Sequence, residues 1–260
     1  MTFISVEGLT KRFSSAGRER AVFEDLHFGI DEGEFLTVVG PSGCGKSTLL
    51  KIVAGLVPAS AGTVRFRGNV VTTPPREMVY VFQQYEKSIF PWLTVRENVG
   101  FGLRKRTELD APAKAARAQR FIDRVGLADF ADYYPSQLSG GMQQRVALAR
   151  ALACQPAVLL MDEPFSAVDA LTRANLQQLV LELWRELALT VVFVTHDVDE
   201  AVYVSSRVIA LAGRPARVDL DLAIPVPYPR DPVRSHEDPR FIARRSELFR
   251  SITQQRAAPP

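Results

Sequence analysis

The chain has 260 residues, of which 47% are hydrophobic and 23% charged, so its composition is that of a folded globular protein rather than a disordered one. A net charge of only +3 gives no argument for nucleic acid as a partner, and two cysteines suit a reducing compartment and give no zinc-ligand spacing. The first residues lack the basic and apolar regions of a signal peptide, and no apolar stretch approaches the ~18 residues that span a bilayer. We therefore expect a protein of the cytosol unless a partner holds it at a membrane.

The first clear element is the apolar, β-branched run at residues 35–40, which ends at a glycine and predicts a buried parallel strand. The residues after it predict a turn that leads directly into a helix. One face of this helix is expected to carry Leu49, Leu50, Val53 and Leu56.

The turn itself, GPSGCGKS, matches the pattern G-x-x-x-x-G-K-[ST] in the strand–loop–helix context that gives this pattern its meaning. Glycines let the backbone wrap closely around phosphate groups, and the helix that follows presents its positive end to them. We expect Lys46 to reach the β- and γ-phosphates and the hydroxyl of Ser47 to bind Mg²⁺. The expected nucleotide-binding residues of this loop are Gly40, Pro41, Ser42, Gly43, Cys44, Gly45, Lys46, Ser47 and Thr48.

Residues 86–150 predict a mostly helical insertion into an α/β core. Thr94 and Glu97 have the spacing of a capping box before a first helix. A second helix is expected to begin near Asp110 and to close at Gly126. A third helix is expected to begin within the sequence LSGGMQQR, which contains no carboxylate and no metal ligand.

The apolar run at residues 157–164 ends in two adjacent acids, Asp162 and Glu163. Burying two carboxylates at a strand end without a cation would be costly, so the pair itself indicates a metal. We expect Asp162 to hold Mg²⁺ and Glu163 to polarise the attacking water as a general base. Two solvated loop acids are the alternative, which the apolar run before them disfavours.

A further apolar run, residues 190–196, ends at His196, and a helical pattern separates it from the previous run. Strands that alternate with helices predict a parallel sheet covered on both faces. Ligand sites in such sheets lie at strand ends, although a histidine there is more often structural. On local grounds Gln83 is a neutral loop residue, and Phe13 suits either core packing or a stacking platform for a base.

After about residue 216 the composition changes. A proline-rich linker, IPVPYPRDP, precedes a short amphipathic helix. The apolar residues expected on one side of this helix are Phe241, Ile242, Leu248, Phe249 and Ile252.

Together these motifs resemble the ATP-binding subunit of an ABC transporter over roughly residues 1–215. That family carries a P-loop, a Q-loop glutamine, an LSGGQ signature, an acidic strand, a D-loop and a switch histidine in fixed order. Here the order is filled by Gly40–Ser47, Gln83, Leu138–Met142, Asp162–Glu163, Ser166–Asp169 and His196. Three departures are mild: Met142 replaces the signature glutamine, Val168 replaces the usual D-loop leucine, and Phe13 replaces the commoner tyrosine.

The resemblance implies that the chain binds and hydrolyses ATP with Mg²⁺. It assigns catalytic roles to Glu163, Gln83 and His196, with Gln83 contacting Mg²⁺ and the water and His196 touching the γ-phosphate. Phe13 would stack on adenine, and Asp169 would also belong to the nucleotide site. The implied metal ligands are Ser47, Gln83 and Asp162.

The resemblance also implies a head-to-tail dimer in which each signature closes on the ATP held by the other copy. Ser139, Gly140 and Gly141 then place backbone N–H groups at a helix start, where an anion is favoured. Because Cys44 lies inside the phosphate loop, we expect its alkylation to block ATP binding and bound ATP to protect it. Cys154, on a helix expected to be packed, should react slowly.

The implied fold is an α/β P-loop NTPase (RecA-like) core with a parallel sheet, a small antiparallel β region and an inserted helical subdomain. The expected parts are a nucleotide-binding core at 1–85 and 151–215, a helical subdomain at 86–150 and a C-terminal tail at 216–260. The segment IFPWLTVRENV and the tail resemble the importer subgroup for nitrate, sulfonates and taurine. This subgroup implies integral membrane permease subunits as partners, a substrate-binding protein indirectly, and a peripheral location at the cytoplasmic face of the membrane.

Two other readings stay open. A soluble ABC-type ATPase that acts on DNA or ribosomes, uncoupled to transport, usually has coiled coils, zinc-bearing insertions or two cassettes. This chain has one cassette, no heptads and no basic stripe. A P-loop kinase or GTPase is opposed by the signature and by Glu163 directly after Asp162.

Overall fold

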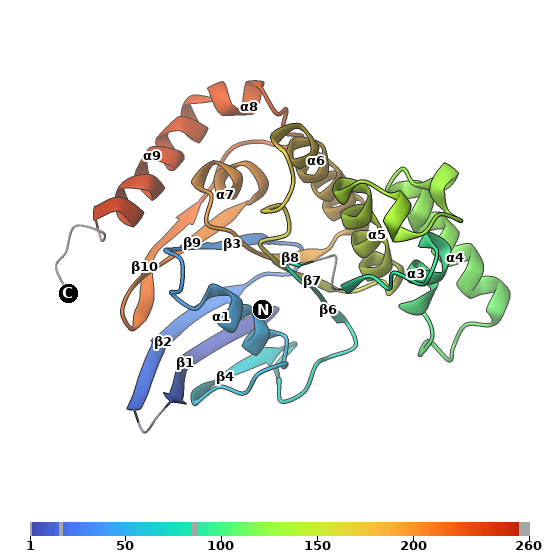
Figure 1. The fold of residues 1–260 in the computed structure, drawn as a ribbon. Helices are drawn as coiled ribbons and strands as arrows, with labels where there is room; N and C mark the ends of the chain where they lie inside the picture. The colour runs from blue at the N-terminus through green and yellow to red at the C-terminus, as the bar shows by residue number, and fades with distance from the viewer. Residues whose placement is uncertain (1, 16–17, 85–87, 255–260) are drawn as a thin grey trace. The chain divides into compact units, whose positions relative to one another are not determined.

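The structure is a computed structural model that describes residues 2–15, 18–84 and 88–254. The chain divides into two compact units (Figure 1). The first unit consists of Met1–Pro75 and Trp184–Pro260, and the second of Arg76–Leu183. None of the helices in the described ranges has both the length and the apolar character needed to cross a bilayer.

The first unit is built on a mixed sheet in which neighbouring strands follow the order β5-β4-β1-β2-β10-β9-β3-β8. Its strands are β1 (Ile4–Ser15), β2 (Arg18–Ile30), β3 (Phe35–Val39), β4 (Ala61–Phe66), β5 (Asn69–Val70), β8 (Thr190–Val194), β9 (Arg207–Gly213) and β10 (Ala216–Ala223). Strand β3 pairs in parallel with both β8 and β9, whereas β1 pairs antiparallel with β2 and β4. The expected α/β fold, with a parallel sheet and an antiparallel β region, is therefore confirmed.

The helices of the first unit are α1 (Lys46–Val53), α7 (Val198–Val204), α8 (Arg234–Glu237) and α9 (Pro239–Gln254). Leu49, Leu50 and Val53 of α1 are buried as expected. The placement of Leu56 on the same packed face is wrong, because α1 ends before it and its side chain is 45% exposed.

The second unit contains the parallel pair β6 (Met78–Val81) and β7 (Val158–Asp162) with a group of helices. These are α3 (Val95–Phe101), α4 (Ala111–Arg124), the 3₁₀ turns η1 (Ala128–Phe130) and η2 (Pro135–Gln137), α5 (Gly140–Ala153) and α6 (Ala170–Leu187), which runs past the boundary between the units. Helices α3, α4 and α5 pack against one another.

Local signals set the ends of the first two of these helices. The Thr94 hydroxyl accepts from the backbone N–H of Glu97 while the Glu97 carboxylate accepts from the N–H of Thr94, which is the predicted capping box. The Asp110 carboxylate caps α4 by accepting from the N–H of Ala113. Gly126 follows α4 with a φ of 71°, a left-handed conformation that favours glycine. Both predicted helices are confirmed.

The segment after residue 216 is only partly as expected. Strand β10 precedes the proline-rich linker, and α9 then packs on α7, β9 and β10 (Figure 1). Phe241 and Leu248 of α9 are buried, but Ile242 and Phe249 are 47% and 57% exposed. The prediction of a single apolar side was wrong because each exposed residue lies one position, about 100°, further round the helix than a buried one.

The linker is held to α7 by a buried arginine. The Arg230 guanidinium donates to the backbone carbonyls of Val202, Tyr203 and Val226 and stacks 4.0 Å above the Tyr228 ring. Burial lowers the pKa of Arg230, and the three carbonyls compensate for its desolvation. The tail is therefore an integral part of the first unit.

Candidate nucleotide-binding site

The expected site residues fall in both units and are described unit by unit. In the first unit, the loop GPSGCG leaves the buried strand β3 and leads into α1. Gly45 has a φ of 99°, and a Cβ atom there would lie 2.3 Å from Cγ1 of Val22 on β2. Only glycine meets both constraints, so the packing of β2 and the conformation of the loop together require a glycine at position 45.

The ammonium group of Lys46 lies over this loop. Its Nζ donates to the carbonyl oxygens of Gly40 at 2.9 Å and Pro41 at 3.2 Å, and the side chain is only 5% exposed. Ser47 and Thr48 follow in the first turn of α1, where the backbone N–H groups and the helix dipole favour an anion. The loop therefore combines a fixed cation with a helix start, as phosphate binding requires.

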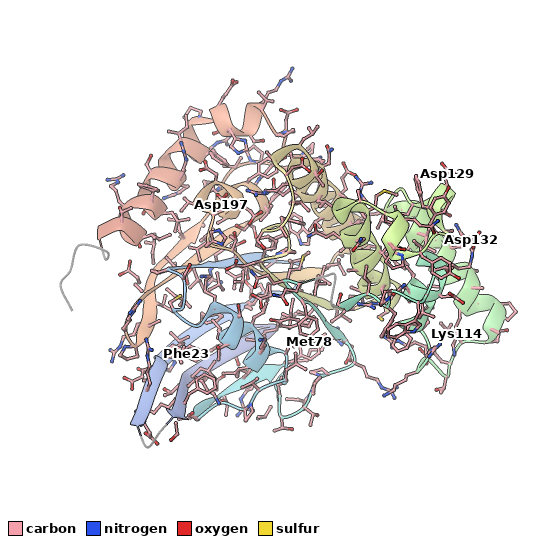
Figure 2. All side chains as sticks on the ribbon, in the orientation of Figure 1. Phe23, Met78, Lys114, Asp129, Asp132 and Asp197 are labelled. Atoms are coloured by element: carbon pink, nitrogen blue, oxygen red, sulfur yellow. The ribbon has the colours of Figure 1, made fainter. Side chains whose placement is uncertain are left out.

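His196 lies at the same edge of the sheet as the loop. Strands β3 and β8 are parallel neighbours with Val38 paired to Val194, so the carboxyl ends of both strands lie at the same edge of the sheet. His196 is exposed there, and the next residue, Asp197 (labelled in Figure 2), caps α7 by accepting from the N–H of Glu200. His196 therefore lies at the end of a parallel strand, where ligand sites in such sheets are found.

Phe13 lies on β1 and is 47% exposed, so it is not part of the packed core. The Nζ of Lys11 lies 4.8 Å from the centre of its ring, a cation–π contact. Of the two readings left open by the sequence, exposure favours a stacking surface over core packing.

In the second unit, Asp162 ends β7 and is 4% exposed. Its Oδ2 accepts a hydrogen bond of 2.8 Å from the hydroxyl of Tyr80, which lies on the parallel neighbour β6. The sequence did not single out Tyr80, because strand pairing that far apart in the chain cannot be read from local patterns. A tyrosine three positions before the Q-loop glutamine was the available signal.

Glu163 follows with a φ of 42°, a left-handed conformation that is rare for a residue with a side chain. Its Oε2 accepts from the Nε2 of Gln83 at 3.2 Å, and its backbone carbonyl accepts from the hydroxyl of Ser166 at 3.0 Å. The structure thus brings two of the expected catalytic residues into contact, and backbone strain of this kind gathers at functional sites.

The signature begins α5. The Ser139 hydroxyl caps the helix by accepting from the N–H of Met142 at 3.3 Å, and Gly140 is exposed. At Gly141 a Cβ atom would lie 2.4 Å from Cγ2 of Thr172 on α6. The second glycine therefore has a packing reason of its own, which the sequence did not reveal.

Asp169 is exposed and accepts from the N–H of Thr172 at 3.0 Å, at the start of α6. This backbone hydrogen bond holds the pKa of Asp169 below its usual value. The aspartate of the D-loop is thus a helix-capping residue in the described structure.

A groove with a volume of about 590 Å³ lies within the second unit. Its walls come from β6 and the residues after it, from the end of α3, and from α5. Phe90 lines it and packs against Phe101, with ring centres 4.4 Å apart. The fully buried Asn98 fixes this wall by exchanging hydrogen bonds with the backbone N–H and carbonyl of Phe90.

The two thiols differ in exposure. Cys44 is 6% exposed, whereas Cys154 is partly exposed and lines the groove. Burial raises the pKa of both thiols, which lowers the thiolate fraction at neutral pH. Cys154 is therefore more exposed than the expectation of a packed helix implied, while the expected block of ATP binding by alkylation of Cys44 stays a prediction.

We expect iodoacetamide to label Cys154 faster than Cys44 in the folded chain. Because both pKa values are raised, labelling of each should stay slow at pH 7 and accelerate only above the pH at which an ordinary thiol ionises. Peptide mass spectrometry after timed labelling at several pH values measures both rates. In the urea-unfolded chain the two rates should converge, and faster labelling of Cys44 in the folded chain would contradict the burial described above.

A glycine loop between a buried strand and a helix, its lysine held over the loop, and a buried strand ending in two carboxylates define a P-loop nucleotide-binding protein. The family model for ABC transporters matches residues 23–166. The chain belongs to this family, and it is an ATP-binding protein with ATPase activity.

Known relatives cover most of the chain. It is 43% identical over 227 residues to the aliphatic sulfonates import ATP-binding protein SsuB of Bacillus cereus, covering 87% of this chain and 88% of that protein. It is 42% identical to the bicarbonate transport ATP-binding protein CmpC of Synechococcus elongatus, covering 98% of this chain but 38% of that protein. A solved ATP-binding cassette, dimeric and bound to ADP and Pi after hydrolysis, is 33% identical with a TM-score of 0.75, covering 85% of this chain and 98% of the other.

Proposed function

We propose that this chain is the ATP-hydrolysing subunit of an importer for a small anion and that it drives a membrane permease. The relatives named for sulfonate import and bicarbonate transport support this class of substrate, since both compounds are small anions. These relatives favour transport over the alternative of a soluble ATPase uncoupled to transport. A substrate-binding protein would deliver the anion to the permease, and the chain would be a peripheral protein at the cytoplasmic face of the membrane.

One observation carries the proposal. The amide of Gln83 donates to the carboxylate of Glu163, and the next residue, Gln84, already lines the groove of the second unit. A catalytic carboxylate and a surface that suits a partner are thus joined by adjacent residues of one segment. We infer that the groove receives a short helix of the permease and that Gln83 links its occupancy to the nucleotide.

The chemistry assigned to the chain follows from its side chains. Lys46 binds the β- and γ-phosphates and His196 the γ-phosphate, while Glu163 takes a proton from the attacking water. The hydrogen bond from Gln83 orients the Glu163 carboxylate for this step. Phe13 stacks on the adenine through its exposed ring.

The donor set fits Mg²⁺. The buried Asp162 carboxylate, the Ser47 hydroxyl and the Gln83 amide oxygen are hard oxygen ligands, which this ion prefers. The described residues contain no group of three or more His, Cys, Asp or Glu placed to hold a metal, and magnesium in phosphate-transfer sites needs only one or two carboxylates. When bound, Mg²⁺ neutralises charge on the phosphate oxygens.

Two copies of the chain would enclose the nucleotide head to tail. The dimeric cassette in the solved structure supports a second copy as a partner. Ser139, Gly140 and Gly141, at the start of α5, would contact the ATP held by the other copy, with Asp169 close to the same phosphates. The positive end of α5 favours the negative charge of that ATP.

Charged substitutions at Phe90, which lines the groove, and at Trp92, whose ring centre lies 5.5 Å from that of Phe90, test the permease assignment. Trp92→Glu or Phe90→Glu is expected to reduce the amount of chain bound to membranes of its own cells at least tenfold, because a buried unpaired carboxylate is costly at an apolar interface. Trp92 is 69% exposed, so its replacement should leave folding intact. Membrane sedimentation and ATP binding are measured together.

Val70→Glu is the matched control, since Val70 is an exposed apolar residue of β5 in the other unit. It should leave membrane recruitment unchanged. If Trp92→Glu and Phe90→Glu chains bind membranes as well as the wild type, the permease contacts a different surface.

A further inference from the structure

Tyr80 has two environments at once. Its hydroxyl donates to Oδ2 of Asp162 at 2.8 Å, and the residue is part of the groove lining. The ring also packs against Phe82, with ring centres 4.6 Å apart and planes tilted by 49°. Tyr80 therefore belongs to the groove lining and also contacts the buried carboxylate.

The hydrogen bond has a fixed direction. An ionised carboxylate can only accept a hydrogen bond, so the phenolic O–H of Tyr80 is the donor. The bond occupies Oδ2 of Asp162. A ligating carboxylate held in this way by an outer partner is oriented for its metal through the remaining oxygen.

The pairing of β6 with β7 fixes the contact between Tyr80 and Asp162. Strands β6 and β7 are parallel with Tyr80 paired to Leu160, so Asp162 lies two residues further along the neighbouring strand on the same face. Helix α5 packs on β6 and contributes Ala147 and Ala151 to the groove. A change in what fills the groove thus meets a residue that is bonded to Asp162.

We propose that Tyr80 is a positioning residue that holds the Asp162 carboxylate for Mg²⁺ and transmits the occupancy of the groove to it. The proposal rests on the proposed function, in which Asp162 binds Mg²⁺ with the nucleotide. Gln83 links the groove to Glu163, whereas Tyr80 links it to the metal carboxylate. Because coupling between two sites is reciprocal, filling the groove changes metal affinity and metal binding changes the affinity of the groove for its occupant.

Tyr80→Phe removes the hydroxyl and keeps the ring that packs against Phe82. The Mg²⁺ concentration for half-maximal binding of a fluorescent ADP analogue should rise about tenfold, the usual effect of losing an outer partner of a metal ligand. ADP binding in EDTA should not change, which a general loss of structure would not permit. Tyr228→Phe is the matched control, because it removes a buried hydroxyl that donates to the carbonyl of Val204.

A second experiment tests whether filling the groove changes Mg²⁺ binding through Tyr80. Ala151→Leu fills part of the groove from α5 and should shift the Mg²⁺ midpoint at least threefold in a chain with Tyr80. In the Tyr80→Phe chain the same substitution should leave the midpoint nearly unchanged, a non-additive cycle. If Ala151→Leu does not fold, Ala147→Leu, one turn earlier on the same helix, replaces it.

The outcomes separate the two claims. A wild-type chain that binds ADP with a Mg²⁺ dependence, beside a Tyr80→Phe chain with the same midpoint, overturns the role of Tyr80 and leaves the proposed function standing. Additive shifts in the cycle overturn the transmission. A wild-type chain that binds no nucleotide at any Mg²⁺ concentration overturns the proposed function and this inference together.

Discussion

Glu163→Gln is expected to lower ATP turnover by ~10²–10⁴-fold, the usual effect of removing a general base. The substitution keeps the size of the side chain and an oxygen that can accept from Gln83. Nucleotide binding should therefore be retained, and ATP that is bound but not hydrolysed should accumulate in a closed dimer. Steady-state phosphate release and size-exclusion chromatography with ATP and Mg²⁺ measure the two effects.

Glu182→Gln is the matched control, since it neutralises an exposed carboxylate on α6 that contacts only Gln178 among the hydrogen bonds described. Its turnover should equal that of the wild type. Near-normal turnover by Glu163→Gln would show that Glu163 is not the general base. The strained backbone at this residue would then have no catalytic explanation.

The elements nearest the phosphate loop were predictable because their signals are local. A run of buried β-branched residues predicts β3, and Gly45 with Lys46 predicts the loop and the start of α1. Capping residues likewise placed α3 and α4, because a side chain and the backbone N–H that it binds are only three residues apart.

Features that depend on distant contacts could not be predicted. Tyr80 meets Asp162 only because β6 and β7 pair, and the side chain that limits the space at Gly141, that of Thr172, lies on another helix. In α9, periodicity indicates which residues share a face but not which face a neighbour covers, so Ile242 and Phe249 were placed wrongly. Roles that come from the family, such as that of Asp169, stay predictions.

The second large effect that we expect is the loss of ATP-dependent dimer closure when the signature is altered. Ser139→Arg fills the exposed start of α5 with a bulky side chain and removes its N-cap, which by itself costs only about 1 kcal/mol. Lys46→Ala removes the ammonium group that binds the carbonyls of the phosphate loop. A homodimer of either variant should have two damaged sites and should fail to close on ATP.

A mixed dimer distinguishes the two possible partners of the signature. If the signature acts on the other copy, one site joins the intact loop of the Ser139→Arg chain to the intact signature of the Lys46→Ala chain. The second site combines the damaged loop of the Lys46→Ala chain with the filled signature of the Ser139→Arg chain. If the signature serves the loop of its own chain, every site in the mixture stays damaged. Nucleotide at 100 times its dissociation constant stabilises the closed form by only about 2.7 kcal/mol per site, so high protein concentration is needed.

The most direct measurement is therefore ATP-dependent cross-linking between differently tagged Lys46→Ala and Ser139→Arg chains. An ATP sandwich between two copies predicts a cross-linked heterodimer that forms with ATP, while neither variant alone is cross-linked. A wild-type mixture run in parallel should be cross-linked under the same conditions. If the wild type closes on ATP and the mixed variants never do, the signature does not act across the dimer, and the proposed sandwich is wrong.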